Sequence, residues 1–307
     1  MKNILISGVA GFIGSHLSDF YLKKNYRVFG LDNFLTGSYE NIKHNLNNKY
    51  FHFIEHDICE KIKLDEKIDL IHHFASPASP FDYLNHPIET LKTGSLGTEN
   101  MLDLAFKKNA TILVASSSEV YGDPKEHPQK ETYFGNVNPI GPRSVYDEAK
   151  RYLEALTIAY KKKRKLDVRI ARIFNTYGPR MRNNDGRAIP NFINQSLHNK
   201  NFTIYGNGSQ TRSFCYIDDT IMGVHKLIES KYSKPVNIGN PDEYSIIELI
   251  KIIKKMMSSE NTVEYEQLPE DDPKVRRPDI SLAWEILTWK PEITLKEGLK
   301  NTIAFYK

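Results

Sequence analysis

The sequence predicts an α/β protein, with a doubly wound parallel sheet in its first part and a smaller mixed α+β lobe after it. Two observations support this prediction. Over the first 178 residues, short apolar runs alternate with stretches of helical periodicity, which is typical of a parallel sheet covered by helices on both faces. Beyond that point the alternation loosens, and turn clusters at residues 183–186 and 206–209 separate shorter elements.

The predicted elements follow one another in alternating order. Strands are expected at residues 3–7, 27–31, 51–55, 70–75, 111–116 and 168–174. Helices are expected at residues 12–23, 89–108 and 146–160, and in the second lobe at 245–257 and 280–287. Strands and helices in this order are what a Rossmann dinucleotide-binding domain needs. We therefore assign residues 1–178 to that domain and 179–307 to the smaller lobe, with part of 213–240 expected to return to the first.

Composition narrows the class of protein. The chain has 307 residues, with 42 Lys and Arg against 38 Asp and Glu, so the net charge is +4. No apolar run approaches the roughly 18 residues of a membrane-spanning helix, and the apolar start is too short for a secretory signal. Cys59 and Cys215 are too few for a disulfide framework or a zinc site. We expect a cytoplasmic protein with no membrane partner and no metal.

The densest basic stretch, residues 161–165, follows a predicted helix and precedes a predicted strand. The helix dipole favours cations at such a position. Neither zinc-finger spacing nor an aromatic RNA-binding signature accompanies it. We interpret the stretch as a solvated helix end and predict no nucleic-acid partner.

A glycine-rich loop directly follows the first predicted strand. Gly8, Gly11 and Gly14 form a Gly-x-x-Gly-x-x-Gly pattern, which permits a tight turn and a close backbone approach to a pyrophosphate at a helix N-terminus. Asp32 ends the second predicted strand, eighteen residues after Gly14. A carboxylate there accepts hydrogen bonds from ribose hydroxyls and repels a 2′-phosphate, so we predict NAD rather than NADP.

A tyrosine and a lysine stand four residues apart on a predicted helix. This spacing places Tyr146 and Lys150 on one helix face, where the ammonium is expected to lower the pKa of the phenol and make it a general base. Ser118 and Glu119 follow the fifth predicted strand, at the sheet edge where α/β proteins bind ligands. Together these residues predict proton and hydride transfer at a hydroxyl group.

The whole chain resembles the extended short-chain dehydrogenase/reductase family, and within it the UDP-glucuronate decarboxylases, also called UDP-xylose synthases. The most specific segments read Ser-Pro-Ala-Ser-Pro at 76–80 and Gly-Asn-Val-Asn-Pro-Ile-Gly-Pro-Arg at 135–143. Further matching segments lie at residues 90–93, 119–124, 172–181, 208–214, 268–273 and 276–280.

The resemblance implies that Tyr146, assisted by Lys150, deprotonates the C4 hydroxyl of UDP-glucuronate while C4 hydride passes to NAD⁺. The resulting β-keto acid would lose CO₂, and protonation at C5 with return of the hydride would give UDP-xylose. Tyr146 and a serine hydroxyl would donate to the developing oxyanion, and Ser118 is the serine placed in the catalytic set. Glu119 would orient the sugar or a water, and Arg276 would position the sugar and the phosphates. These five residues are the predicted catalytic set.

The resemblance also implies the residues around each ligand. NAD would be held by Gly8, Gly11, Phe12, Ile13, Gly14, Asp32, Asn33, Phe34, Thr36, Gly37, Asp57, Ile58, Ala75, Ser76, Ala78, Thr93, Tyr146, Lys150 and Thr176. The UDP-sugar would contact Tyr83, Lys92, Asn100, Asn175, Asn191, Tyr205, Gln210, Arg212 and Arg276. The chain departs from the family pattern at Pro190, beside the expected uridine site, and at Gly94, where asparagine is common.

Several alternatives stay open. A 4-epimerase shares Tyr146, Lys150 and NAD, and a decarboxylase could release the 4-keto pentose instead of UDP-xylose. A 4,6-dehydratase of the dTDP-glucose type would carry an Asp-Glu pair where this chain has Ser118 and Glu119, but some GDP-mannose dehydratases use a hydroxyl residue and a Glu, so a 4,6-dehydratase stays an alternative. A non-catalytic NAD-sensing protein would not need these residues. Family members usually dimerise through a four-helix bundle, so a homodimer is expected. The helices predicted at 89–108 and 146–160 could supply this bundle or could equally cover the sheet within one chain.

Overall fold

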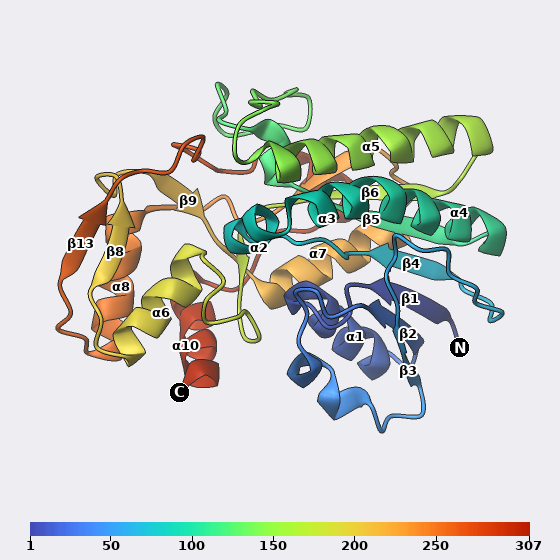
Figure 1. Ribbon diagram of the computed structural model, residues 1–307, viewed down its shortest axis with the longest axis horizontal. Coiled ribbons are helices and arrows are strands. Elements are labelled where there is room, and N and C mark those ends of the chain that lie inside the picture. Colours follow the sequence, from blue (N-terminus) through green and yellow to red (C-terminus); the bar gives the residue numbers. More distant parts are fainter.

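A seven-stranded parallel sheet forms the centre of the protein, whose computed structural model describes residues 1–307 (Figure 1). Its order is β11-β6-β5-β4-β1-β2-β3. The strands are β1 (Asn3–Ser7), β2 (Arg27–Asp32), β3 (Phe51–Glu55), β4 (Leu70–His73), β5 (Thr111–Ser117), β6 (Val168–Ile173) and β11 (Pro235–Ile238). The order reverses direction between β1 and β4, so the carboxyl ends of these strands border a crevice suited to a ligand. The α/β class predicted from the sequence is confirmed.

Helices cover both faces of this sheet. In Figure 1, α3, α4 and α5 lie on one face, and α1 and α7 on the other. Their bounds are α1 (Phe12–Lys23), α2 (Pro80–Asn85), α3 (Pro87–Lys92), α4 (Thr98–Lys108), α5 (Ser144–Arg164), α7 (Ile217–Glu229) and α9 (Ser281–Leu287). Short 3₁₀ turns lie at η1 (Tyr39–Asn41), η2 (Lys43–Asn45) and η4 (Ser118–Tyr121). Each face of the sheet has its own cluster of buried apolar side chains, because helices cover the parallel sheet on both sides.

The helix predicted at 89–108 is interrupted in the structure. Between α3 and α4 the chain forms a π-helical turn, η3 (Thr93–Gly97). Gly94 lies in this turn against α5, where an added Cβ would stand 2.7 Å from the Cβ of Ala149. The prediction of one continuous helix is therefore wrong, because the π turn depends on packing against another helix. Such π turns are frequent at functional sites.

The second lobe is built from short elements beside one end of the sheet (Figure 1). It contains α6 (Ala188–Leu197), β8 (Phe202–Tyr205), β9 (Thr211–Ser213), β12 (Glu243–Ser245), α8 (Ile246–Met257), β13 (Val263–Glu266) and α10 (Leu295–Tyr306). β8 pairs with β13 in parallel, and β9 pairs with β12 antiparallel. A third small sheet joins β7 (Thr176–Tyr177) and β10 (Cys215–Tyr216). The chain from α7 to β11 packs on the large sheet, where β11 pairs with β6.

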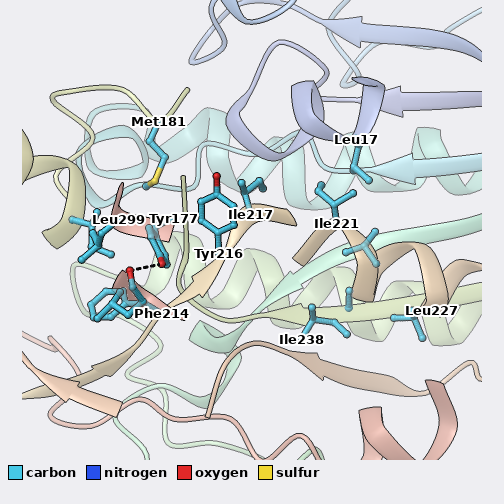
Figure 2. Close-up of a cluster of buried hydrophobic side chains, with 14 of the residues drawn as sticks. Leu17, Tyr177, Met181, Phe214, Tyr216, Ile217, Ile221, Leu227, Ile238 and Leu299 are labelled. Atoms are coloured by element: carbon cyan, nitrogen blue, oxygen red, sulfur yellow. Dashed lines mark hydrogen bonds between the residues drawn. The ribbon is translucent and has the colours of Figure 1, made fainter. Parts of the chain in front are cut away.

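A shared apolar core joins the two lobes. Figure 2 shows Leu17 of α1 and Ile238 of β11 in the same cluster as Leu299 of α10, and all three side chains are fully buried. The hydroxyl of Tyr177 in this cluster donates to the carbonyl of Leu295, 3.2 Å away. Each large aliphatic side chain buried here contributes about 1.5–3 kcal/mol. The continuous core holds the lobes in a fixed relation and so fixes the walls of the space between them.

The basic stretch at 161–165 forms the last turn and the C-cap of α5. Its Arg164 pairs with Asp103 of α4 at 3.0 Å, with both side chains partly exposed. No helix of the chain combines the length and apolar character needed to cross a bilayer.

Candidate active site

A cavity of about 700 Å³ lies between the two lobes. One end is formed by the glycine loop after β1, and the other by Tyr205 and Gln210 of the second lobe. A small pocket adjoins the glycine loop and contains Asp32. The cavity therefore extends from the glycine loop to the second lobe along the carboxyl edge of the sheet, where α/β proteins bind ligands.

The glycine loop is shaped by two close approaches. Gly8 has a φ of +76°, which favours glycine, and an added Cβ there would stand 2.8 Å from the backbone of Ala75. An added Cβ at Gly14 would stand 2.0 Å from the carbonyl oxygen of Gly8, so α1 packs directly on the loop. Because α1 begins at Phe12, its free N–H groups point into the cavity end where a pyrophosphate would be favoured.

Asp32 is fixed at the end of β2. Its carboxylate accepts hydrogen bonds from the backbone N–H groups of Ala10 and Phe34, each at 2.9 Å. Burial raises the pKa of this carboxyl, and these backbone donors oppose that rise. The small pocket around it is lined by predicted cofactor residues, namely Asn33, Thr36, Gly37, Asp57, Ile58, Ala75, Ser76 and Thr93. Of the predicted cofactor residues, Phe34 lines neither space; its ring packs against Phe53, 5.2 Å between centroids.

Tyr146 and Lys150 lie buried on one face of α5 at the middle of the cavity. The Lys150 Nζ donates to the carbonyl of Ala115, 2.9 Å away, and lies 5.5 Å from the centroid of the Tyr146 ring. Burial raises the pKa of Tyr146 to about 12, while an interaction with the Ser117 hydroxyl lowers it. Burial also lowers the pKa of Lys150 to about 8. The lowered phenol pKa expected from the sequence is therefore not found in the free site, because burial outweighs the groups that favour phenolate.

The serine run after β5 is arranged differently from the sequence expectation. Ser117, the last residue of β5, lines the cavity beside Tyr146. Ser118 is buried at the start of the following 3₁₀ turn and does not line the cavity; its carbonyl accepts from Arg276. The structure thus places Ser117, and not the predicted catalytic Ser118, in the cavity beside Tyr146.

Glu119 is held between two arginines. Its Oε2 accepts from Arg143 at 2.7 Å and from Arg276 at 3.1 Å. Burial alone would raise the pKa of Glu119, but the Arg276 and Arg143 charges lower it to about 2. Arg276 is itself buried and also donates to the Gly122 carbonyl at 2.9 Å. Glu119 is therefore an anion at neutral pH, suited to accept hydrogen bonds and to orient its neighbours.

Tyr83 lines the cavity beside Tyr146. Its ring stacks on Tyr146 with 5.2 Å between centroids and 12° between planes. The Arg143 guanidinium lies 5.9 Å from the Tyr83 ring centroid. The Tyr83 hydroxyl is buried without a protein partner, so it is free to hydrogen-bond a ligand in the cavity.

The predicted substrate residues divide into two groups. Asn175, Asn191, Tyr205, Gln210 and Arg212 line the cavity together with Tyr83 and Arg276. Lys92 is exposed on α3 outside the cavity, and Asn100 donates to the Ile58 carbonyl at 2.9 Å instead of facing a ligand. Pro190 occupies the first turn of α6, where a missing N–H costs no helix hydrogen bond, so this departure leaves the helix intact.

Further arginines line the cavity that sequence reasoning did not single out. Arg143 ends the family-like segment 135–143, but its spacing in the sequence did not indicate that it would pair with Glu119. Arg182 pairs with Asp82, Arg187 pairs with Asp185, and all four side chains line the cavity. Their position in a turn-rich stretch was the available signal. No group of three or more His, Cys, Asp or Glu side chains is arranged to hold a metal ion.

Comparison with known proteins identifies similar chains. The model of the GDP-mannose 4,6 dehydratase family matches residues 5–302. The chain is 48% identical over 305 residues to UDP-glucuronic acid decarboxylase 1 from Danio rerio, covering 99% of this chain and 72% of that protein. It is also 48% identical to UDP-glucuronic acid decarboxylase 1 from Arabidopsis thaliana, covering 99% and 69%.

The fold is similar to a solved epimerase structure. UDP-glucuronic acid 4-epimerase from Bacillus cereus, in complex with UDP-glucuronic acid and NAD, superposes with a TM-score of 0.88. The two proteins are 30% identical, and the match covers 99% of this chain and 98% of that one.

Proposed function

The chain belongs to the GDP-mannose 4,6 dehydratase family and, within it, to the UDP-glucuronic acid decarboxylases, and on that premise we propose that it converts UDP-glucuronate to UDP-xylose with a bound NAD. The observation that carries this proposal is the meeting of Tyr146, Lys150, Glu119 and Arg276 in one cavity with the glycine loop. The 48% identity to decarboxylases, against 30% to the 4-epimerase, supports the choice of reaction.

The residues around the glycine loop fit a dinucleotide. Gly8, Gly11 and the N-terminus of α1 would hold the pyrophosphate, and the Asp32 carboxylate would hold the adenosine ribose. The absence of a Cβ at Gly14 keeps the loop close to the helix. When bound there, NAD would supply reversible hydride transfer at the sugar C4.

Tyr146 acts at the sugar C4 oxygen. As phenolate it takes the proton of the C4 hydroxyl, and the Ser117 hydroxyl and the Arg187 charge are the groups that favour this ionisation. The Lys150 ammonium lies 5.5 Å from the centroid of the Tyr146 ring. The C4 ketone makes the C6 carboxylate a β-keto acid, so loss of CO₂ leaves an enolate at C4–C5. The Tyr146 and Ser117 hydroxyls can donate to the enolate oxygen, which stabilises the charge as it develops.

Glu119 and Arg276 would position the reacting sugar. Because the pKa of Glu119 lies at about 2, it is an acceptor rather than an acid. It can orient a water that delivers the proton to C5, while Arg276 attracts the anionic substrate. Tyr83, stacked on Tyr146, would keep bulk water from the enolate.

Product analysis tests the proposal. Purified protein is incubated with UDP-glucuronate, and the products are identified by mass spectrometry and NMR. The proposal expects a UDP-pentose that has lost CO₂ and has the C4 configuration of xylose. A C4 epimer of unchanged mass would identify a 4-epimerase, and a hydrated 4-ketone as main product would identify a decarboxylase that releases its intermediate.

We also propose that the protein is a homodimer. Large apolar side chains in the ranges predicted for this role are exposed, with Leu91, Leu96 and Tyr152 each 42–50% accessible. Light scattering after gel filtration tests this proposal. Leu91→Arg is expected to give a monomer, whereas Trp284→Arg, at an exposed residue of α9, is expected to stay dimeric. The cytoplasmic compartment stays a prediction.

A further inference from the structure

Five charged side chains of alternating sign form a continuous series of ion pairs along the cavity wall. From the second lobe inward, Arg212 Nη2 lies 2.8 Å from Asp272 Oδ2, and Asp272 Oδ1 lies 3.6 Å from Arg143 Nη1. Arg143 and Arg276 then share Glu119 Oε2. All five residues line the cavity, so the series connects the second-lobe wall with the groups beside Tyr146.

Asp272 joins two parts of the protein in this series. Arg212 lies on β9, Arg143 is the N-cap residue of α5, and Asp272 belongs to the segment 268–273 between β13 and α9. The side chains of Asp272, Arg212 and Arg143 are 24%, 13% and 15% exposed. Because they are partly shielded from water, these pairs are stronger than surface ion pairs.

A carboxylate in this position is unexpected for a cavity that receives an anion. Between two guanidinium groups, a carboxylate oxygen makes the same charge-assisted hydrogen bonds as a phosphate oxygen. Arg212 is otherwise anchored by a 2.9 Å hydrogen bond from Nη1 to the Thr211 carbonyl, so the Nη2 edge that pairs with Asp272 is an edge a ligand could take. Asp272 and a phosphate group would therefore compete for the same donors.

We propose that Asp272 is an internal counter-ion of the diphosphate site: it pairs with Arg212 and Arg143 in the free protein and releases Arg212 when a nucleoside diphosphate binds. This inference rests on the proposed UDP-sugar substrate. It makes Asp272 a positioning residue, since it acts through the two arginines. The 3.6 Å contact to Arg143 is the longer of its two ion pairs, so a carboxylate released by Arg212 has a partner to which it can move.

The neighbouring aspartate supplies a matched control. Asp271 lies in the same segment and accepts a hydrogen bond from the Asn138 side chain at 3.0 Å, but it forms no ion pair with an arginine. Replacing it removes the same charge one residue away. Any general effect of charge on anion binding should therefore appear in both variants, whereas competition for Arg212 should appear only at Asp272.

Calorimetric titration with UDP and with uridine tests the proposal. Asp272→Asn is expected to bind UDP at least about threefold more tightly than the wild type, because a partly buried competing ion pair is removed. Uridine, which has no phosphate, should bind equally to both proteins, and Asp271→Asn should match the wild type. Asp272→Ser removes the charge without adding an amide and is expected to give the same gain. Thermal melts confirm that each variant is folded.

The direction of the change separates the possible roles. A clamp that only orders the arginines would be weakened by Asp272→Asn, so unchanged or weaker UDP binding would overturn the inference. An equal gain in Asp271→Asn, or a gain that persists when Arg212→Gln is present in the same chain, would also overturn it. A wild-type protein that binds no UDP would instead contradict the proposed substrate class, and so the two failures are distinguishable.

Discussion

Replacing Glu119 by glutamine tests the charge arrangement around the cavity. Two arginines lower the pKa of the carboxyl from 4.5 to about 2. At about 1.36 kcal/mol per pKa unit, the ionised carboxylate is stabilised by about 3 kcal/mol in the folded protein. Glu119→Gln leaves Arg276, which is 1% exposed, without this compensating charge. We therefore expect the free energy of unfolding to fall by about 3 kcal/mol at pH 7.

Urea unfolding at two pH values measures this effect. Because the folded-state pKa is lowered, the stabilisation is present above about pH 4.5 and is lost as the pH falls toward 2. The difference between wild type and Glu119→Gln should therefore shrink at pH 3. Asp103→Asn, which removes a partly exposed pair with Arg164, is the control and should cost less than about 1 kcal/mol. Equal losses for the two variants, or a Glu119→Gln loss independent of pH, would refute the reasoning.

Three further predictions concern the reaction site. Tyr146→Phe keeps the ring stacked on Tyr83 but removes the proton acceptor, so we expect turnover to fall at least about 100-fold while calorimetric UDP affinity stays unchanged; comparable turnover would exclude Tyr146 as the base. Ser117→Ala removes a group that lowers the Tyr146 pKa, so the acidic limb of the pH–rate profile should move to higher pH, and a shift to lower pH would contradict this assignment. Gly14→Ala places a Cβ 2.0 Å from the Gly8 carbonyl oxygen, and the purified variant should carry little or no NAD in its absorbance and mass spectra; full NAD content would show that the loop can relax.

The fold was predictable where local patterns determine it. Apolar runs marked the first six strands of the large sheet, because buried parallel strands are apolar on both faces. Strand β11 was not predicted, because Pro235–Ile238 is only a short apolar run and the chain reaches it after passing through the second lobe. The break at Gly94 was also missed, because it depends on packing against Ala149 of another helix.

In the candidate site, too, features set by local sequence were predictable and features set by tertiary contacts were not. Residues with fixed spacing on one element, such as Tyr146 and Lys150, could be placed from the sequence. The position of Ser117 beside Tyr146 depends on where β5 ends, which a run of three serines does not reveal. The ion pair of Arg143 with Asp272 joins segments far apart in the chain, so no local pattern could have indicated it.

Release of the C6 carbon tests the central claim most directly. UDP-glucuronate labelled with ¹³C at C6 is incubated with the purified protein, and ¹³C NMR follows the label, with Tyr146→Phe as the control. The account predicts that the label leaves as CO₂ and bicarbonate while unlabelled UDP-xylose accumulates, and that the control releases it at least about 100-fold more slowly. Label retained in a UDP-hexuronate product would contradict it.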